Sequence, residues 1–214
     1  LKMNKVTSKV FVIDDDDEIL SAYSLLLKST GYQVECFTGI DLFLERENYI
    51  GAGCILLDVF LGAKTGLEVQ AEIESKFEFL PIIFITGHGN IPMSVEAIKK
   101  GALNFLQKPV DEQELIKAID EALSRSSEIL AKYNEIDKMR SLIHSLTARE
   151  FEIFTYVIRG KLNKQIAAEL GIAEHTVKNH RLNITEKLGV KSVPEMIYIA
   201  EKLNIQRDTN SITN

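Results

Sequence analysis

The feature that most constrains the fold is an alternation, over the first 123 residues, of short apolar runs with longer segments of helical period. Apolar runs of four or five residues are typical of strands buried on both faces of a parallel sheet. Five such strands are expected, at 9–13, 33–37, 54–57, 81–85 and 103–106. The segments between them predict helices that cover both faces, and therefore a doubly wound parallel α/β sheet. Ligands of such sheets bind beyond the carboxyl ends of the strands.

Glycine and proline mark the ends of the predicted helices. The first helix is expected to end at Gly31, and the second and third are expected at 41–47 and 66–75. The fourth has Pro92 in its first turn and ends before Gly101, which is the usual asymmetry of these two residues. This punctuation supports five helices in alternation with five strands.

A long helical linker is expected after residue 111. Asp111, with Glu114 three residues later, resembles a helix-starting box. Apolar residues then recur at helical spacing through about His144, and a break near 124–127 is left open. The apolar stripe of this linker could pack on either domain or pair with another chain, and its pattern does not favour one of these.

The remainder of the chain is predicted to be entirely helical. Thr147 and Glu150 have the spacing of a capping box, which starts a helix. Four further residues end or begin helices: Gly160, Gly171, Gly189 and Pro194. Since 214 residues are comfortable for two domains, we predict a first domain, a helical linker, an all-helical domain and a flexible tail. Their ranges are 1–123, 124–144, 145–207 and 208–214.

Charge and cysteine content restrict the partners and the compartment. Residues 1–123 hold 20 acidic and 11 basic side chains, whereas the residues from 145 onward hold 8 and 10, so the two domains are expected to have different partners. The mildly basic second domain can dock on DNA although the whole chain is acidic. Cys36 and Cys54 lie in apolar segments and are expected to be buried thiols. Without a membrane-length apolar stretch or a signal-peptide pattern, a cytoplasmic location is expected.

Carboxylates gather at the carboxyl edge of the predicted sheet. Asp14 and Asp15 follow the first strand, and Asp58 follows the third. Such a cluster is stable only when it is protonated or bridged by a cation, and an all-oxygen site suits Mg²⁺. Thr86 and Lys108 end the fourth and fifth strands at the same edge, so these groups together could carry a phosphoryl group on Asp58. For the acidic run 14–17 alone, a solvated helix N-terminus is the ordinary alternative.

The segments VFVIDDD, CILLDVFL, FITGHG and ALNFLQKP, at these spacings, resemble the receiver domain of response regulators over roughly residues 7–123. The resemblance implies that Asp58 is the phosphoacceptor and that Thr86 and Lys108 contact the phosphoryl group. It implies a magnesium site formed by four groups: Asp14, Asp15, Asp58 and the backbone carbonyl of Phe60. It also implies a cis bond between Lys108 and Pro109.

Phe105 stands where this family keeps a switch aromatic, which turns inward as Thr86 moves, although a plain core role is the alternative. Two residues depart from the family pattern. Gly62 replaces a common proline, and bulky Phe60 stands where polar residues are common, so water access to the pocket could differ. We interpret His88, beside the pocket, as a loop-packing residue rather than a catalytic base.

The segment LTAREFEIFTYVIRGKLNKQIAAELGIAEHTVKNHRLNITEKLGVKS resembles the NarL/FixJ (LuxR-type) helix-turn-helix over roughly residues 145–205. Helical spacing predicts a small core, formed by Ile166, Ala167, Leu170, Val177, Leu182 and Ile184. The resemblance implies base-edge positions at Thr176, Lys178, Asn179 and Leu182. Arg181 is a further candidate DNA contact, and Lys164 is expected on a phosphate.

Two features of this helical domain remained open. Ala173 stands where the family favours a serine N-cap, so the recognition helix either lacks a cap or uses another residue. The apolar residues of the helix after Pro194 could form a dimer contact on DNA or an ordinary core.

For the receiver, the expected dimer face lies around residues 95–100.

Together these features predict a phosphorylation-dependent transcriptional regulator. A sensor histidine kinase or a small phosphodonor would phosphorylate Asp58 with Mg²⁺, and the phosphorylated homodimer would bind double-stranded promoter DNA, with RNA polymerase as a possible further partner. Membrane binding and enzymatic turnover beyond Asp58 are not expected. A phosphorylation-independent regulator with a dimerising pseudo-receiver is the main alternative. A Mg²⁺-dependent aspartyl phosphohydrolase is disfavoured, because that chemistry usually needs a second acid where Phe60 stands.

Overall fold

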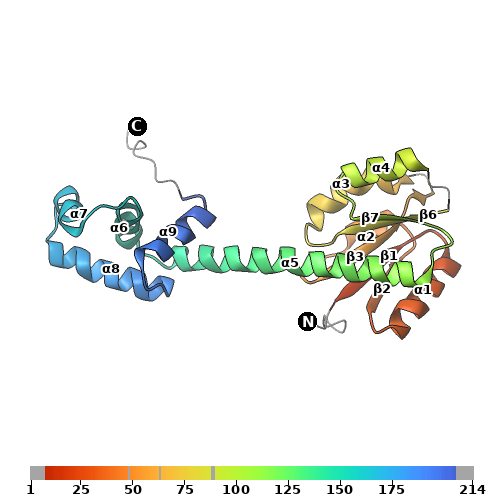
Figure 1. Ribbon diagram of the computed structural model, residues 1–214, viewed down its shortest axis with the longest axis horizontal. Coiled ribbons are helices and arrows are strands. Elements are labelled where there is room, and N and C mark those ends of the chain that lie inside the picture. The colour runs from red at the N-terminus through yellow and green to blue at the C-terminus, as the bar shows by residue number, and fades with distance from the viewer. Residues whose placement is uncertain (1–7, 48, 63, 88–89, 206–214) are drawn as a thin grey trace. The chain divides into compact units, whose positions relative to one another are not determined.

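Five parallel strands form one sheet in the first part of the chain (Figure 1). The computed structural model describes residues 8–47, 49–62, 64–87 and 90–205. The strands of the sheet are β1 (Lys9–Ile13), β2 (Gln33–Phe37), β3 (Gly53–Asp58), β6 (Ile82–Thr86) and β7 (Asn104–Gln107). Their order across the sheet is β2-β1-β3-β6-β7, which confirms the predicted doubly wound parallel α/β sheet.

Helices bury both faces of this sheet. They are α1 (Asp17–Ser29), α2 (Ile40–Glu45), α3 (Gly66–Lys76), α4 (Ile91–Lys99) and α5 (Glu112–His144). On one face, α1 and the first part of α5 contribute Leu27 and Ile119 to the core. On the other face, α2, α3 and α4 contribute Phe43, Ile73 and Ala97. The three inner strands, β1, β3 and β6, are apolar on both sides, as the continuous apolar runs predicted, whereas the edge strands β2 and β7 are partly polar and exposed.

The register of the sheet brings the carboxyl ends of its strands to one edge. Asp58 at the end of β3 pairs with Ile85 of β6, and Thr86 pairs with Gln107 at the end of β7. Ile13, the last residue of β1, pairs with Leu57. The polar residues that follow these strands are therefore neighbours in space although they lie far apart in the sequence.

A small antiparallel ladder follows β3 and was not predicted. It pairs β4 (Phe60–Leu61) with β5 (Lys64–Thr65). Gly62 has a φ of +63°, a left-handed conformation that glycine adopts without steric cost. Strands of two residues carry no usable alternation of polar and apolar residues, so the pattern could not reveal them.

Helix α5 runs without a break from Glu112 to His144, and the break considered near 124–127 is absent. The two serines there do not compete with the helix. The fully buried Ser126 hydroxyl donates to the Phe79 carbonyl and accepts from the Gly53 amide, while Ser127 donates to the carbonyl of Leu123. Among the helices of the described residues, none is long and apolar enough to cross a membrane.

The chain divides into two compact units, residues 1–131 and 132–214, and α5 belongs to both. The second unit contains the end of α5 with α6 (Ala148–Ile158), α7 (Asn163–Leu170), α8 (Glu174–Leu188) and α9 (Val193–Lys202). Phe154, Ile166 and Val177 are fully buried in its core. Met196 and Ile199 of α9 are also buried in this core, which was one of the two roles considered for α9.

The helix ends of the second unit follow the predicted chemistry with one exception. Thr147 and Glu150 form the capping box of α6, and Gly171 and Gly189 end α7 and α8 in the left-handed conformation. Ala173 stands at the N-cap of α8 without a side-chain hydrogen bond. The recognition helix candidate therefore lacks a side-chain cap.

Two apolar residues lie outside the cores that their spacing predicted. Leu182 is 58% exposed, although its neighbours Val177 and Ile184 are buried. Cys36 is exposed rather than buried, because β2 is an edge strand that α1 covers incompletely, and its thiol lies 3.8 Å from the Leu20 carbonyl oxygen. Cys54 is buried, and both thiols are free.

An internal ion pair joins α6 to α8. The Glu150 carboxylate is buried and lies 2.6 Å from Lys187 Nζ. The hydrogen bond from Lys187, and then that from the Thr147 amide, lower the pKa of Glu150 to about 2. Because this pKa lies below the ordinary value of 4.5, the pair stabilises the fold above pH 4.5, and this contribution is lost as pH falls toward 2.

Glu150→Gln is expected to lower the free energy of unfolding at pH 7 by about 1–3 kcal/mol, the usual cost of removing one partner of a buried charged hydrogen bond. The difference from the wild type should shrink as pH falls from 4.5 toward 2. Urea unfolding monitored by circular dichroism measures both effects. Glu152→Gln, which breaks only the exposed pair with Arg149, is the control, and an equal cost for the two variants would contradict the assignment.

Candidate functional site

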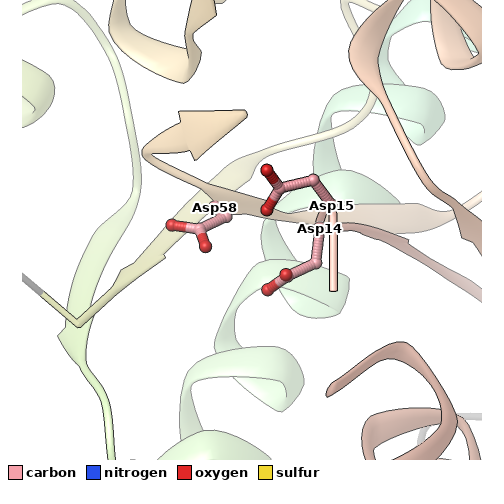
Figure 2. A group of neighbouring side chains, drawn as sticks. All are labelled: Asp14, Asp15 and Asp58. Carbon is pink, nitrogen blue, oxygen red and sulfur yellow. The ribbon is translucent and has the colours of Figure 1, made fainter. Parts of the chain in front are cut away.

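Three carboxyl groups meet at the carboxyl edge of the sheet (Figure 2). Asp14 and Asp15 follow β1 directly, and Asp58 is the last residue of β3. One oxygen from each lies within 4.8 Å of the others. Asp14 is buried, Asp58 is half-buried and Asp15 is exposed, so the cluster has one side open to solvent. The parallel register is what brings these carboxyl groups together.

Backbone amides hold two of these carboxylates in place. Asp14 Oδ1 accepts a hydrogen bond from the amide of Asp16 at 3.0 Å, and Asp58 Oδ1 accepts one from the amide of Phe60 at 3.2 Å. Asp16 in turn caps α1 by accepting from the amides of Glu18 and Ile19. The second half of the acidic run thus forms a helix N-terminus, whereas Asp14 and Asp15 precede the cap.

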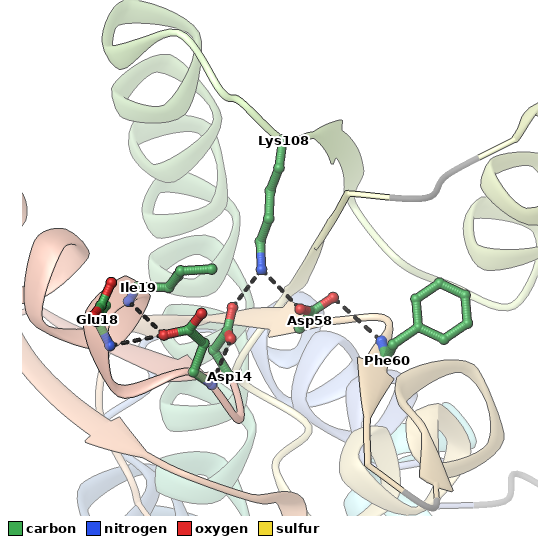
Figure 3. A network of polar contacts seen from close by, with 7 residues as sticks. Asp14, Glu18, Ile19, Asp58, Phe60 and Lys108 are labelled. Atoms are coloured by element: carbon green, nitrogen blue, oxygen red, sulfur yellow. Dashed lines mark hydrogen bonds and ion pairs between the residues drawn. The ribbon is translucent and has the colours of Figure 1, made fainter.

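The Lys108 ammonium bridges two of the carboxylates (Figure 3). Its Nζ atom lies 2.6 Å from Asp14 Oδ2 and 2.8 Å from Asp58 Oδ2. The backbone amide of Lys108 donates to the carbonyl of Thr86, which fixes the residue at the end of β7. The bond between Lys108 and Pro109 is cis, as expected. The pocket thus has an anchored cation among three acidic groups.

Burial and hydrogen bonding oppose each other in this cluster. Burial raises the pKa of Asp14 above its ordinary value, although the hydrogen bond from Lys108 works against this effect. For Lys108, burial lowers the pKa, but the hydrogen bonds to Asp14 and Asp58 outweigh it and leave the pKa raised. Lys108 therefore stays cationic at neutral pH. One ammonium among three carboxyl groups leaves the pocket short of positive charge.

The other predicted pocket residues lie around this cluster. Thr86 ends β6 and is fully buried. Phe105 of β7 is half-buried, and its ring centroid lies 6.3 Å from that of Phe84. Phe60 is 43% exposed, and its ring points away from the carboxylates (Figure 3). His88 lies outside the described residues.

Lys108→Met is expected to lower the free energy of unfolding at pH 7 by about 1–3 kcal/mol, because it leaves two carboxylates facing each other without their cation. The loss should be smaller at pH 5 than at pH 7, because burial raises the pKa of Asp14, so that lowering the pH reduces the negative charge that needs a counter-charge. Denaturant unfolding at the two pH values measures this difference. Lys117→Met, at an exposed position of α5, is the control, and a cost that does not change with pH would argue against the electrostatic explanation.

A second polar surface lies on α8. Lys178, Asn179 and Leu182 are exposed, and their spacing of three or four residues puts them on one face of this helix. Lys178 pairs with Glu174 at 3.2 Å, and Thr176 is half-buried. The surface carries hydrogen-bonding, cationic and apolar groups within two helical turns.

Two further candidates for DNA contact have different surroundings. Lys164 is exposed near the start of α7. Arg181 is half-buried, and its Nη1 lies 2.7 Å from Asn163 Oδ1, so this guanidinium joins α8 to α7. Asn163 was not predicted, because a contact between residues 18 positions apart leaves no periodic signal in the sequence.

Comparisons with known proteins identify both units. A model of the response regulator receiver domain matches residues 10–120, and a model of bacterial regulatory proteins of the luxR family matches residues 144–200. The response regulator protein TodT from Pseudomonas putida is 41% identical over 94% of this chain and 88% of its own length. The chain belongs to the response regulators. The predicted receiver and LuxR-type DNA-binding domain are thereby confirmed.

Other response regulators are similar to this chain along nearly its whole length. The transcriptional regulatory protein FixJ from Azorhizobium caulinodans is 36% identical over 89% of this chain and 90% of its own length. The solved structure of the response regulator StyR has a TM-score of 0.82 and 42% identity, and covers 92% of this chain and 99% of that one. This response regulator is therefore a phosphorylation-responsive transcription regulator with a DNA-binding domain, and its receiver implies a histidine kinase partner.

Proposed function

We propose that this response regulator accepts a phosphoryl group on Asp58 and thereby controls dimerisation and promoter binding. The observation that carries the proposal is the position of Asp58, at the carboxyl end of β3, with Lys108 Nζ 2.8 Å from Oδ2 and two further acids beside it. The Asp58 carboxylate attacks the phosphorus of a phosphohistidine on the kinase. The phosphorus–nitrogen bond breaks, its electron pair stays on the imidazole, and an acyl phosphate forms on Asp58.

Magnesium fits the donor set of this pocket. Its ligands would be Asp14, Asp15, Asp58 and the backbone carbonyl of Phe60, and the three carboxyl oxygens already lie within 4.8 Å of one another. Hard oxygen ligands with an open side suit an ion that keeps waters and accepts phosphate oxygens. The bound ion would supply the positive charge that the pocket lacks when a phosphoryl group arrives.

Residues of the pocket then bind the phosphoryl group. The Lys108 ammonium pairs with its negative charge, as it now pairs with Asp14 and Asp58. The Thr86 hydroxyl donates a hydrogen bond to a phosphoryl oxygen. Phe105 lies on the strand beside Thr86 and is only half-buried, so there is scope for its ring to turn inward as Thr86 moves. Beyond this self-modification and slow loss of the phosphate we assign no enzymatic activity.

Helix α4 supports a dimeric active form. Ile91, Val95 and Ile98 are exposed at spacings of four and three residues, and they form an apolar stripe whose last two residues lie in the predicted dimer face at 95–100. A phosphorylated homodimer would present two DNA-binding domains to double-stranded promoter DNA, with RNA polymerase as a further partner. We also retain the predicted domain boundaries and a cytoplasmic location as parts of this proposal.

Helix α8 is the proposed recognition helix, with its front end in the major groove. Thr176, Lys178, Asn179 and Leu182 would approach base edges, while Lys164 would bind a phosphate. Arg181 would act less directly, because its guanidinium already bonds to Asn163. These assignments rest on the exposure of the α8 face and on the match to the luxR family.

Asp58→Asn is expected to abolish phosphate uptake, because an amide is not a nucleophile for phosphorus. With Mg²⁺ and acetyl phosphate, the intact mass of the wild type should increase by one phosphoryl group, and light scattering after size exclusion should shift from monomer to dimer. Neither change should occur in the variant, and Asp16→Asn, outside the pocket, is the control. Phosphate uptake by Asp58→Asn would refute the assignment of Asp58 as the phosphoacceptor. A wild type that stays unphosphorylated and still binds its operator with full affinity would favour a phosphorylation-independent regulator with a pseudo-receiver.

Lys164→Gln is expected to weaken binding to all DNA sequences to a similar degree. If its ammonium contacts one phosphate, the slope of log K against log salt concentration should become less negative by about 0.9 for each bound protomer. Fluorescence anisotropy between low and moderate salt measures this slope. Lys117→Gln removes the same charge from an exposed position in the receiver and should leave the slope unchanged. Equal slopes for the wild type and Lys164→Gln would show that Lys164 does not contact a phosphate.

A further inference from the structure

Leu182 is a large aliphatic residue of α8 whose side chain lies outside the core of the second unit. The other large aliphatic residues of α8, Val177, Ile184 and Leu188, are 0–3% exposed and lie in the core of the second unit. Leu182 is 58% exposed, and it makes no part of that core. Because exposing a large aliphatic side chain to water is unfavourable, packing within the domain gives no reason for a leucine here.

The surroundings of Leu182 match the major groove rather than a protein partner. Asn179 lies three residues before it and Lys178 four residues before it, so the three side chains share one exposed helix face. The ammonium of Lys178 is already paired with Glu174, and Arg181 is turned to Asn163 of α7. On this face, the side chains without an ion partner are therefore those of Asn179, a carboxamide, and Leu182, an isobutyl group.

These two groups complement one kind of base pair. In the major groove, an A·T pair offers the adenine N7 and N6, which a carboxamide can bind, together with the 5-methyl group of thymine, which an apolar side chain can contact. We propose that Leu182 reads the thymine 5-methyl group of an A·T pair in each half-site of the operator, beside the position that Asn179 contacts. This inference rests on the proposed placement of α8 in the major groove.

The test replaces thymine by uracil, which lacks only the methyl group. An operator is first selected with the full-length protein, acetyl phosphate and Mg²⁺ from a random duplex pool. The selected duplex is then synthesised with deoxyuridine at one thymine position at a time, changed together in both half-sites. Fluorescence anisotropy measures each Kd. For the wild type, one position should weaken binding about fourfold per half-site, the factor expected for burial of one methyl group.

Variants of the protein assign this effect to one side chain. Leu182→Ala should bind the thymine and uracil duplexes equally, and thermal unfolding should be unchanged because the side chain lies outside the core. Leu162→Ala, a truncation of the same kind at an exposed leucine before α7, should keep the wild-type preference for thymine. A preference for thymine that survives in Leu182→Ala would overturn the inference.

A second pair of variants separates this inference from the proposal on which it rests. Asn179→Ala and Lys178→Gln should both weaken operator binding if α8 lies in the major groove. If they do so while no uracil substitution affects the wild type, the role of Leu182 is refuted and the placement of α8 stands. If neither variant changes the affinity, the placement of α8 is wrong and the inference fails with it.

Discussion

The receiver depends on the attraction between one ammonium and the carboxylates that a parallel sheet brings together. A parallel register necessarily brings the ends of β1, β3, β6 and β7 to the same edge. Placing the Asp14 carboxylate there costs free energy, because burial and the charge of neighbouring Asp58 both disfavour its charged form. The Lys108 ammonium offsets this cost from a third strand. The same shortage of positive charge that raises the free energy of the empty pocket favours the binding of a divalent cation, which can then hold a phosphoryl group.

The second unit also depends on pairs of polar side chains, which here join neighbouring helices. Its small core must hold short helices at defined angles, and the Glu150 carboxylate does this by closing the capping box of α6 and pairing with Lys187 of α8. Arg181 and Asn163 make a second polar link, between α8 and α7. These two contacts add directional hydrogen bonds and an ion pair to the apolar packing of the helices. They leave one face of α8 exposed.

Most of the fold and of the pocket could be predicted from the sequence, because both depend on short periodic patterns. The sequence pattern predicted the strands of the sheet to within one or two residues, and Asp14, Asp58 and Lys108 lie one or two residues after the predicted strands. Contacts between distant residues were not predictable in this way. The exposure of Leu182, the pairing of Arg181 with Asn163 and the poor cover over Cys36 depend on how elements pack, for which a helical or strand period contains no information. The partners of Ser126 within the continuous helix α5 likewise lie far away in the sequence and could not be predicted from it.

The anchoring of Ser126 has a mechanical consequence. Strand β3 has Asp58 at its carboxyl end and Gly53 at its amino end, and the Gly53 amide is bonded to the Ser126 hydroxyl. The same hydroxyl bonds to Phe79, just before β6, the strand that ends in Thr86. The two central strands that carry pocket residues at one end are therefore joined at their other end to a single point on α5. Ser126 therefore ties the amino end of β3 and the segment before β6 to the middle of α5, so these two strands and the helix share one buried hydrogen-bonded junction far from the pocket.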